Sequence, residues 1–593
     1  MSEKKSFEVK QRPVDAEIEA GALAPITEHT GTVHLTEAAE LYGDAHAAET
    51  YRYVARGLKA RHIQFMGLGG SIGTALFLGI GRALAAAGPL SIFLGYTISG
   101  VAIFGTMQCL GEMTTWLPMP AALPSFASRY VDKALGFAVA WNGWYNYAIT
   151  ICIEISAAAV IIGYWNTTIN VAVWISIIIV LLLFLNLFAV SLYGEAEFWF
   201  ASLKIVTIVG LLILSLVLDL GGGPNHDRIG FRYWKNPGAM NTFVAEGAEG
   251  RFLGLFFSLV MGALSFGGIE AVVIAAGEAK NPRRNLPKAI RRVFWRLVFF
   301  YVLGSLAVGL LVPYNDPDLL SALATGAPGA AGSPWVIAIK KAGIPVLPSI
   351  INAVILSSAT SAANACLYSG SRYLLVMAQQ GFAPKFFLRC SQRGIPYYAV
   401  GCTAVITALT YLSCSAGPVK VFIWLANISA LVSMFSWLTI CITYVRFYAA
   451  LKKQGVSRDD LAFKSPFQPY LAWGTIVFFS ILMLFNGFYS FTPWDTDTFI
   501  STYITVPYVW PLPPPGGMLT NSASIFFGLL IFWKVFKRTK VVDPAEADIW
   551  TGKAAIDAEV WPEPAPKNFI QKASSSTGHV HSMVLIADVS RSL

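Results

Sequence analysis

Long runs of apolar residues, separated by short polar stretches, extend over most of the chain. A helix needs roughly 20 apolar residues to cross a bilayer, and about twelve runs approach that length. Their centres lie near residues 74, 101, 151, 180, 206, 265, 302, 360, 405, 433, 479 and 525. The runs are too long for barrel strands and do not alternate apolar with polar positions. The pattern therefore predicts an all-α polytopic membrane protein with about twelve transmembrane helices.

Lys and Arg residues are concentrated in alternate connections between the predicted helices. They cluster after the sixth span, between Lys280 and Arg296, and again after the eighth, tenth and last spans. Because cytoplasmic loops of membrane proteins carry the excess of basic residues, we expect both termini in the cytoplasm. Residues 1–60 are polar and charged, so we expect a cytoplasmic tail there and no cleavable signal peptide.

Composition agrees with burial in a membrane. Hydrophobic residues make up 55% of the chain and charged residues only 13%, whereas soluble proteins carry about 25% charged residues. The net charge of +9 is located in the loops, so it indicates topology and not a nucleic-acid partner. The seven cysteines are scattered without a CxxC motif, which predicts neither a disulfide framework nor a zinc site. No cofactor is expected and, without an HExxH or paired metal-ligand motif in the spans, no enzyme activity.

Two predicted helices are interrupted by glycine-rich stretches, Gly67–Thr74 in the first span and Ser265–Glu270 in the sixth. Each Gly weakens a helix by about 1 kcal/mol relative to Ala. Close helix packing is one explanation, since small residues line helix contacts in membranes. The positions of the two stretches favour a broken helix instead, because each lies in the first span of one of two successive sets of five spans. Paired interruptions of this kind mark the substrate site in transporters with inverted repeats.

An unwound segment within a membrane leaves backbone groups that only protein, water or a bound solute can satisfy. The N-terminus of a half-helix attracts a carboxylate, and unpaired carbonyl oxygens attract an ammonium group. An amino acid carries both charges on one carbon. The two breaks therefore predict a carrier of amino acids.

Several motifs resemble those of the fungal amino acid permeases. They are Arg61-His62-Ile63 followed by Gly69–Thr74, Gly111-Glu112-Met113, Phe266–Glu270 followed by Gly277–Arg283, and Val312–Asp316. The similarity extends over residues 45–560 and is strongest to general and proline-type permeases. This family belongs to the amino acid–polyamine–organocation superfamily. The resemblance implies its five-plus-five inverted-repeat fold, with helices 1 and 6 broken.

The resemblance also implies proton-driven uptake at the plasma membrane, and where the substrate lies. The backbone of four residues in the first break would receive the carboxylate: Gly70, Ser71, Gly73 and Thr74. Carbonyl oxygens near Ser265, Phe266 and Gly268 would receive the amino group, with Phe266 as an aromatic gate.

Three ionisable residues, Glu154, Lys204 and Glu270, lie within predicted spans. Such groups cost about 2.5–3.5 kcal/mol or more at mid-bilayer and rarely face lipid. Each is either part of a structural ion pair or hydrogen bond, or a group that exchanges a proton near neutral pH. The resemblance implies that Lys204 serves proton coupling, where sodium-coupled relatives hold sodium, and that Glu154 and Glu270 lie near the substrate and contribute to coupling. Arg82 and Arg372, late in their spans, are expected to reach the membrane interface.

These observations predict three regions. Residues 1–60 form a cytoplasmic tail, residues 61–536 the permease domain, and residues 537–593 a second cytoplasmic tail. The inverted repeats are expected at 61–218 and 252–447, followed by two extra helices. The stretch Pro507–Ser524 is rich in Pro and Gly and cannot continue a helix, which leaves the short apolar run Ile525–Phe536. It is either an extracellular loop before a short tilted helix, or an unspliced intron or error in gene prediction.

The expected function is import of neutral amino acids with protons across the plasma membrane by alternating access, with either proline or a broad range of amino acids as the substrate. The alternative is an amino acid sensor that keeps the permease fold without transport. Expected partners are the amino acid, protons and the lipid bilayer. By resemblance, a ubiquitin-ligase adaptor would act on the cytoplasmic tails, with Lys4, Lys5, Lys10 and Lys59 as acceptor lysines.

Overall fold

Helices dominate the computed structural model, which describes residues 74–119, 122–166, 168–188, 190–270, 282–325, 331–391, 394–491, 494, 522–551 and 553. Over these ranges the only β-structure is an isolated bridge between Phe491 and Trp494. Within the same ranges, ten helices are long and apolar enough to span a membrane. They are α5 (Pro89–Trp116), α7 (Lys133–Ile162), α8 (Val171–Phe188), α9 (Val190–Asp219), α10 (Gly247–Ser265), α12 (Pro282–Leu311), α15 (Leu347–Gln379), α16 (Tyr397–Val405, continuing to Ser415), α18 (Pro418–Lys453) and α19 (Tyr470–Phe485, continuing to Ser490).

The ten helices confirm the second to eleventh predicted spans. The first and last predicted spans are shorter in the described residues, as Leu76–Ala87 and as α21 (Ser522–Lys537). Residues 507–521 lie outside the described residues, and Ser522–Ser524 belong to α21. Twelve membrane crossings therefore remain a prediction.

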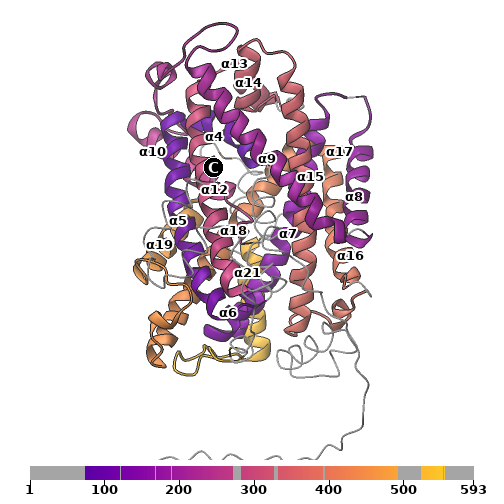
Figure 1. Cartoon of the computed structure of the whole chain (residues 1–593), viewed down its shortest axis with the longest axis vertical. Helices are drawn as coiled ribbons and strands as arrows, with labels where there is room; N and C mark the ends of the chain where they lie inside the picture. Colours follow the sequence, from indigo (N-terminus) through magenta and orange to yellow (C-terminus); the bar gives the residue numbers. More distant parts are fainter. Residues whose placement is uncertain are drawn as a thin grey trace, which may run out of the picture. The chain divides into compact units, whose positions relative to one another are not determined.

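Shorter helices complete the fold. They are the π-helical turn η1 (Ala75–Gly79), α4 (Ile80–Ala87), α6 (Ala122–Tyr130), η2 (Trp234–Gly238), α13 (Pro317–Thr325), α14 (Pro334–Lys341), η4 (Lys385–Leu388), η5 (Ile406–Leu412), α17 (Ser413–Ala416), η6 (Arg458–Asp460) and η7 (Phe488–Ser490). Figure 1 shows α4, α13 and α14 at one end of the long helices and α6 at the other.

Glycine–proline pairs set the start of two long helices. Gly88 precedes α5 with a φ of 81°, and Gly417 precedes α18 with a φ of 86°. Glycine adopts positive φ without a steric penalty. The following Pro89 and Pro418 occupy the first helical position, where a missing N–H costs nothing.

The sixth predicted span is interrupted where its glycines lie. Helix α10 ends at Ser265, and residues 266–270 form turns in which Gly268 has a φ of 82°. The predicted span centre at 265 is therefore the end of a helix. The corresponding glycines of the first span, up to Gly73, lie outside the described residues, so the inverted repeat remains a prediction.

The long helices bring small residues together at close contacts and also expose many large apolar side chains. Gly95 of α5 faces Ser258 of α10 so closely that an added Cβ would lie 2.7 Å from the Ser258 backbone. By contrast, Val180 of α8 and Val206 of α9 are 65% and 68% exposed. Exposed apolar side chains on helices are what contact with lipid requires, so the structure supports a multi-pass membrane protein.

The residues after α21 pack against the helix ends at the α6 end of the molecule (Figure 1). We call residues 538–551 the C-terminal segment. The Val542 N–H donates to the Val131 carbonyl oxygen at 2.8 Å, and Trp116 Nε1 donates to the Ile549 carbonyl oxygen at 2.9 Å. The Ile549 side chain is fully buried. The C-terminal segment is thus part of the folded protein, packed against the ends of the helices.

Candidate functional site

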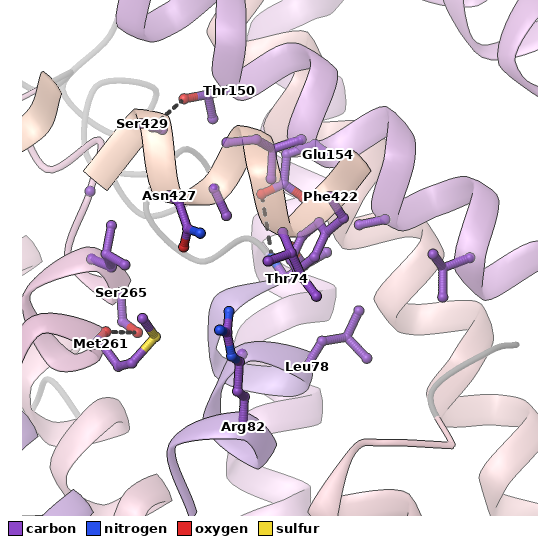
Figure 2. Close-up of a pocket in the computed structure, with 18 of the residues that line it drawn as sticks. Thr74, Leu78, Arg82, Thr150, Glu154, Met261, Ser265, Phe422, Asn427 and Ser429 are labelled. Carbon is purple, nitrogen blue, oxygen red and sulfur yellow. Dashed lines mark hydrogen bonds between the residues drawn. The ribbon is translucent and has the colours of Figure 1, made fainter. Parts of the chain in front are cut away.

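A cavity of about 240 Å³ lies between η1 and α4, α7, α10 and α18 (Figure 2). It is smaller than the 300–1,000 Å³ or so of pockets for drug-sized ligands, so it suits a small solute. Most of the lining is apolar. Side chains carrying polar or charged groups are interspersed: Thr74, Arg82, Tyr96, Asn146, Tyr147, Thr150, Glu154, Ser265, Asn427, Ser429 and Ser433.

Four predicted site residues line this cavity, namely Thr74, Glu154, Ser265 and Gly268. The Thr74 backbone N–H donates to Glu154 Oε1 at 3.4 Å, which links the first predicted break to α7. The other carboxylate oxygen, Oε2, is buried and accepts no hydrogen bond from any described residue. Since buried polar atoms are normally paired, this oxygen is a candidate acceptor for a group on a bound solute.

The broken end of α10 forms the opposite wall. Ser265 Oγ donates to the Met261 carbonyl oxygen at 3.0 Å and shares a hydrogen bond of 3.0 Å with the Tyr96 hydroxyl. Gly267 and Gly268 follow it in the lining. Backbone from the interrupted helix therefore borders the cavity, as the glycine pattern predicts.

A polar wall between α7 and α18 was not predicted. Ser429 Oγ donates to Asn146 Oδ1 at 2.9 Å, and Asn146 Nδ2 donates to Ser433 Oγ at 3.2 Å. Thr150 and Ser429 share a longer contact of 3.5 Å. Single small polar residues in apolar helices are usual at packing contacts, so the sequence carries no signal that separates these from structural ones.

Two other predicted residues lie behind the cavity wall. Phe266 is fully buried, with its ring centroid 4.8 Å from that of Tyr301. Glu270 Oε2 accepts a hydrogen bond from Trp437 Nε1 at 3.4 Å, and Glu270 borders a second, smaller cavity beside Tyr147. Neither touches the larger cavity in this conformation. Gly70, Ser71 and Gly73 lie outside the described residues.

Lys204 is fully buried on α9, in the electrostatic field of Glu154 and Glu197. Glu197 is also buried, and both its carboxylate oxygens accept from Ser361 Oγ at 3.1 Å. Glu197 was not among the residues predicted from the sequence. Its spacing was available as a signal, because it precedes Lys204 by seven residues, about two helical turns, and so lies on the same face.

The expectation is wrong for Arg372 and stays a prediction for Arg82. Arg372 is buried, with its guanidinium 3.7 Å from the centroid of the Tyr368 ring and a hydrogen bond of 3.1 Å to Ser371 Oγ. Arg82 lies in the cavity wall. Snorkelling requires a free route to the headgroups, and Arg372 lacks one because its side chain is buried against Tyr368 and Ser371.

The amino acid permease family matches residues 62–511. The proline-specific permease of Saccharomyces cerevisiae is 45% identical over 76% of this chain and 73% of its own length. The proline-specific permease of Emericella nidulans is 41% identical over 90% and 95% of the two chains, and the lysine-specific permease of S. cerevisiae is 38% identical over 96% and 91%. With this match and a multi-pass helical fold around a small cavity, the chain belongs to the amino acid permease family.

Proposed function

We propose that the protein imports neutral amino acids, including proline, across the plasma membrane by alternating access coupled to protons. Two relatives named for proline, at 45% and 41% identity, support this substrate. The cavity size supports a small solute. Both termini lie in the cytoplasm in this proposal, as the distribution of Lys and Arg indicates.

The observation that carries the proposal is Glu154 Oε2, a buried oxygen of the cavity residue Glu154 that accepts no hydrogen bond from the described residues. A substrate ammonium group is the donor that this oxygen lacks, and charge-assisted hydrogen bonds are about twice as strong as neutral ones. Carbonyl oxygens at the end of α10, near Ser265, Phe266 and Gly268, contribute to the same group. The substrate carboxylate lies against the backbone of the first break, at Gly70, Ser71, Gly73 and Thr74.

Proton coupling is assigned to Lys204 and Glu154, with Glu270 at the second cavity. Lys204 supports this assignment because its charge interacts with two buried carboxylates, one of which lines the substrate cavity. A proton that moves among these groups changes the charge next to the substrate. In this way, substrate binding and protonation are linked.

The test is uptake of radiolabelled proline, arginine and glutamate by vesicles containing the protein, at two pH values and with the proton gradient intact or collapsed. We expect proline uptake that depends on the gradient, and a Lys204→Met variant whose uptake no longer responds to it. Gradient-independent proline uptake would contradict coupling. Binding of proline without uptake would favour the sensor.

The cytoplasmic tails are proposed as substrates of a ubiquitin ligase recruited by an adaptor. Lys4, Lys5, Lys10 and Lys59 are the acceptors in this proposal. Mass spectrometry of the protein from cells supplied with excess amino acid locates the modified lysines, and the absence of modification in the tails would contradict it.

A further inference from the structure

One charged side chain in the cavity is not used by the proposed function. Arg82 lines the cavity together with Thr74 and Leu78, at intervals of four residues. Residues spaced in this way lie on one face of a helix. Figure 2 shows the Arg82 side chain pointing from its helix into the space bordered by these residues and Ser265.

No ion pair formed among the described residues includes Arg82. Its guanidinium lies 5.7 Å from the centroid of the Phe257 ring, an aromatic contact that leaves the charge uncompensated. Among the described residues of the cavity lining, Glu154 is the acidic one and Arg82 the basic one. The described part of the lining thus contains two opposite charges, and no carboxylate within it pairs with the positive one.

The two charges lie at different levels. Arg82 follows Thr74, the residue bonded to Glu154, by eight positions, on the order of 10 Å along a helix. Beside Arg82, Gly81 packs so closely against the start of α14 that an added Cβ would lie 2.4 Å from the Gly332 carbonyl oxygen. Ala322, Leu323 and Gly332 complete the lining at this end. In the proposed topology this end faces the cell exterior, so an incoming solute meets Arg82 before Glu154.

We propose that Arg82 is a specificity determinant that forms an outer subsite for the substrate carboxylate and excludes amino acids with cationic side chains. This inference rests on the proposed function and adds the substrate class. A guanidinium binds carboxylates in bidentate geometry. Apolar cavity walls focus its field, so a zwitterion is admitted, an acidic side chain is attracted and a lysine or arginine side chain is repelled.

The experiment measures inhibition of labelled proline uptake by excess lysine or glutamate. Three variants are compared with the wild type: Arg82→Gln, Arg82→Lys and Arg251→Gln. Arg251 is the matched control, because it is exposed on the first turns of α10, close to the same end as α4, and does not line the cavity. Surface abundance of each variant is measured in parallel to separate transport from expression.

We expect Arg82→Gln to lower the inhibition constant for lysine about tenfold and to raise that for glutamate, as expected for one charge–charge interaction in a partly solvated site. Arg82→Lys retains most of the discrimination, and Arg251→Gln retains all of it. If the wild type takes up proline and Arg82→Gln discriminates against lysine as strongly as the wild type does, this inference is overturned and the proposed function is not. A wild type that takes up no amino acid overturns the proposed function and this inference together.

The contact with Phe257 provides a further distinction. If Arg82 only supported that ring, Arg82→Gln would alter stability and the uptake of all substrates equally. A Phe257→Leu variant removes the aromatic contact and keeps the guanidinium. We expect this variant to keep its discrimination against lysine, and loss of discrimination in it would contradict a direct role for the charge of Arg82.

Discussion

Lys204 is a charged residue in the interior of this protein whose neighbours carry the opposite charge. Lys204 interacts with Glu154 and Glu197, and Ser361 donates to Glu197. Breaking a buried ion pair by removing one partner is costly because the remaining charge is left uncompensated. The group is therefore needed for stability as well as for the proposed coupling.

Glu197→Gln tests this dependence. The amide keeps an acceptor for Ser361 Oγ but removes a negative charge beside Lys204. Loss of one buried partner typically costs about 3–5 kcal/mol, and since Glu154 remains, we expect the lower part of that range. Thermal unfolding of the detergent-solubilised protein measures it. Ser361→Ala, which removes one hydrogen bond and no charge, should cost about 1 kcal/mol, and equal losses in both variants would contradict the electrostatic explanation.

The sequence predicts the location of residues whose side chains are energetically unfavourable in contact with lipid. Glu154 and Lys204 could be predicted as interior, because a lipid-facing charge is strongly unfavourable. The glycines next to Ser265 likewise indicated the break. Asn146 and Arg82 could not be assigned to the cavity, because small polar residues and helix-end arginines each have common structural roles. Only the packing of α4 with α7, α10 and α18 places them at one cavity.

At the scale of helices, the length and apolar content of each run predict well that a membrane-spanning helix forms there, because the requirement for roughly 20 apolar residues concerns each run by itself. Their lateral packing is a property of pairs of helices and is not local. The contact of α5 with α10 depends on Gly95, since any side chain there would overlap Ser258. The last helix, α21, was the hardest to predict because its apolar run is short.

Gly95→Ala should therefore separate α5 from α10. The added Cβ would lie 2.7 Å from the Ser258 carbonyl oxygen, so backbone must move. Overpacking of this kind costs about 1–3 kcal/mol. Gly210→Ala on α9 is the control, because a Cβ there meets nothing within 4 Å. Alanine should stabilise that helix by up to about 1 kcal/mol. Thermal unfolding compares the two, and similar midpoints would contradict the close contact.

Across the whole molecule, charged and polar contacts at the α6 end join segments far apart in sequence. Glu112 of α5 is buried and accepts from the Tyr444 hydroxyl of α18 at 2.6 Å and from the Ser465 N–H at 2.6 Å, and it pairs with Arg458. Asp132, before α7, accepts from Lys534 Nζ at 2.6 Å. These contacts connect helices from both predicted repeats with α21.

Asp132 makes this end sensitive to acid. Burial opposes its ionisation, but hydrogen bonds from Lys534, Thr539 and the Ala134 N–H hold its pKa below the usual range. Because its folded pKa is depressed, the stabilisation is present above about pH 4, the value in an unfolded chain, and is lost as pH falls through the folded pKa. We expect Asp132→Asn to be less stable than the wild type at pH 7, with a difference that shrinks below about pH 4.

Tryptophan fluorescence during thermal unfolding, from pH 7 to pH 3, measures this difference. Asp459→Asn is the control, since Asp459 is exposed and paired with Lys464, and exposed pairs contribute about 0–1 kcal/mol. Parallel curves for Asp132→Asn and the wild type over the whole range would contradict the role of Asp132.

The packing of the C-terminal segment affects how deletions of this protein are interpreted. A chain cut after α21 loses the burial of Ile549 and the bonds to Val131 and Trp116. A cut after residue 553 keeps all of these contacts. If the shorter protein disappears from the cell surface, the first explanation is a destabilised fold that quality control retains, and not the loss of a sorting signal. Only deletions beyond residue 553 can therefore locate such signals.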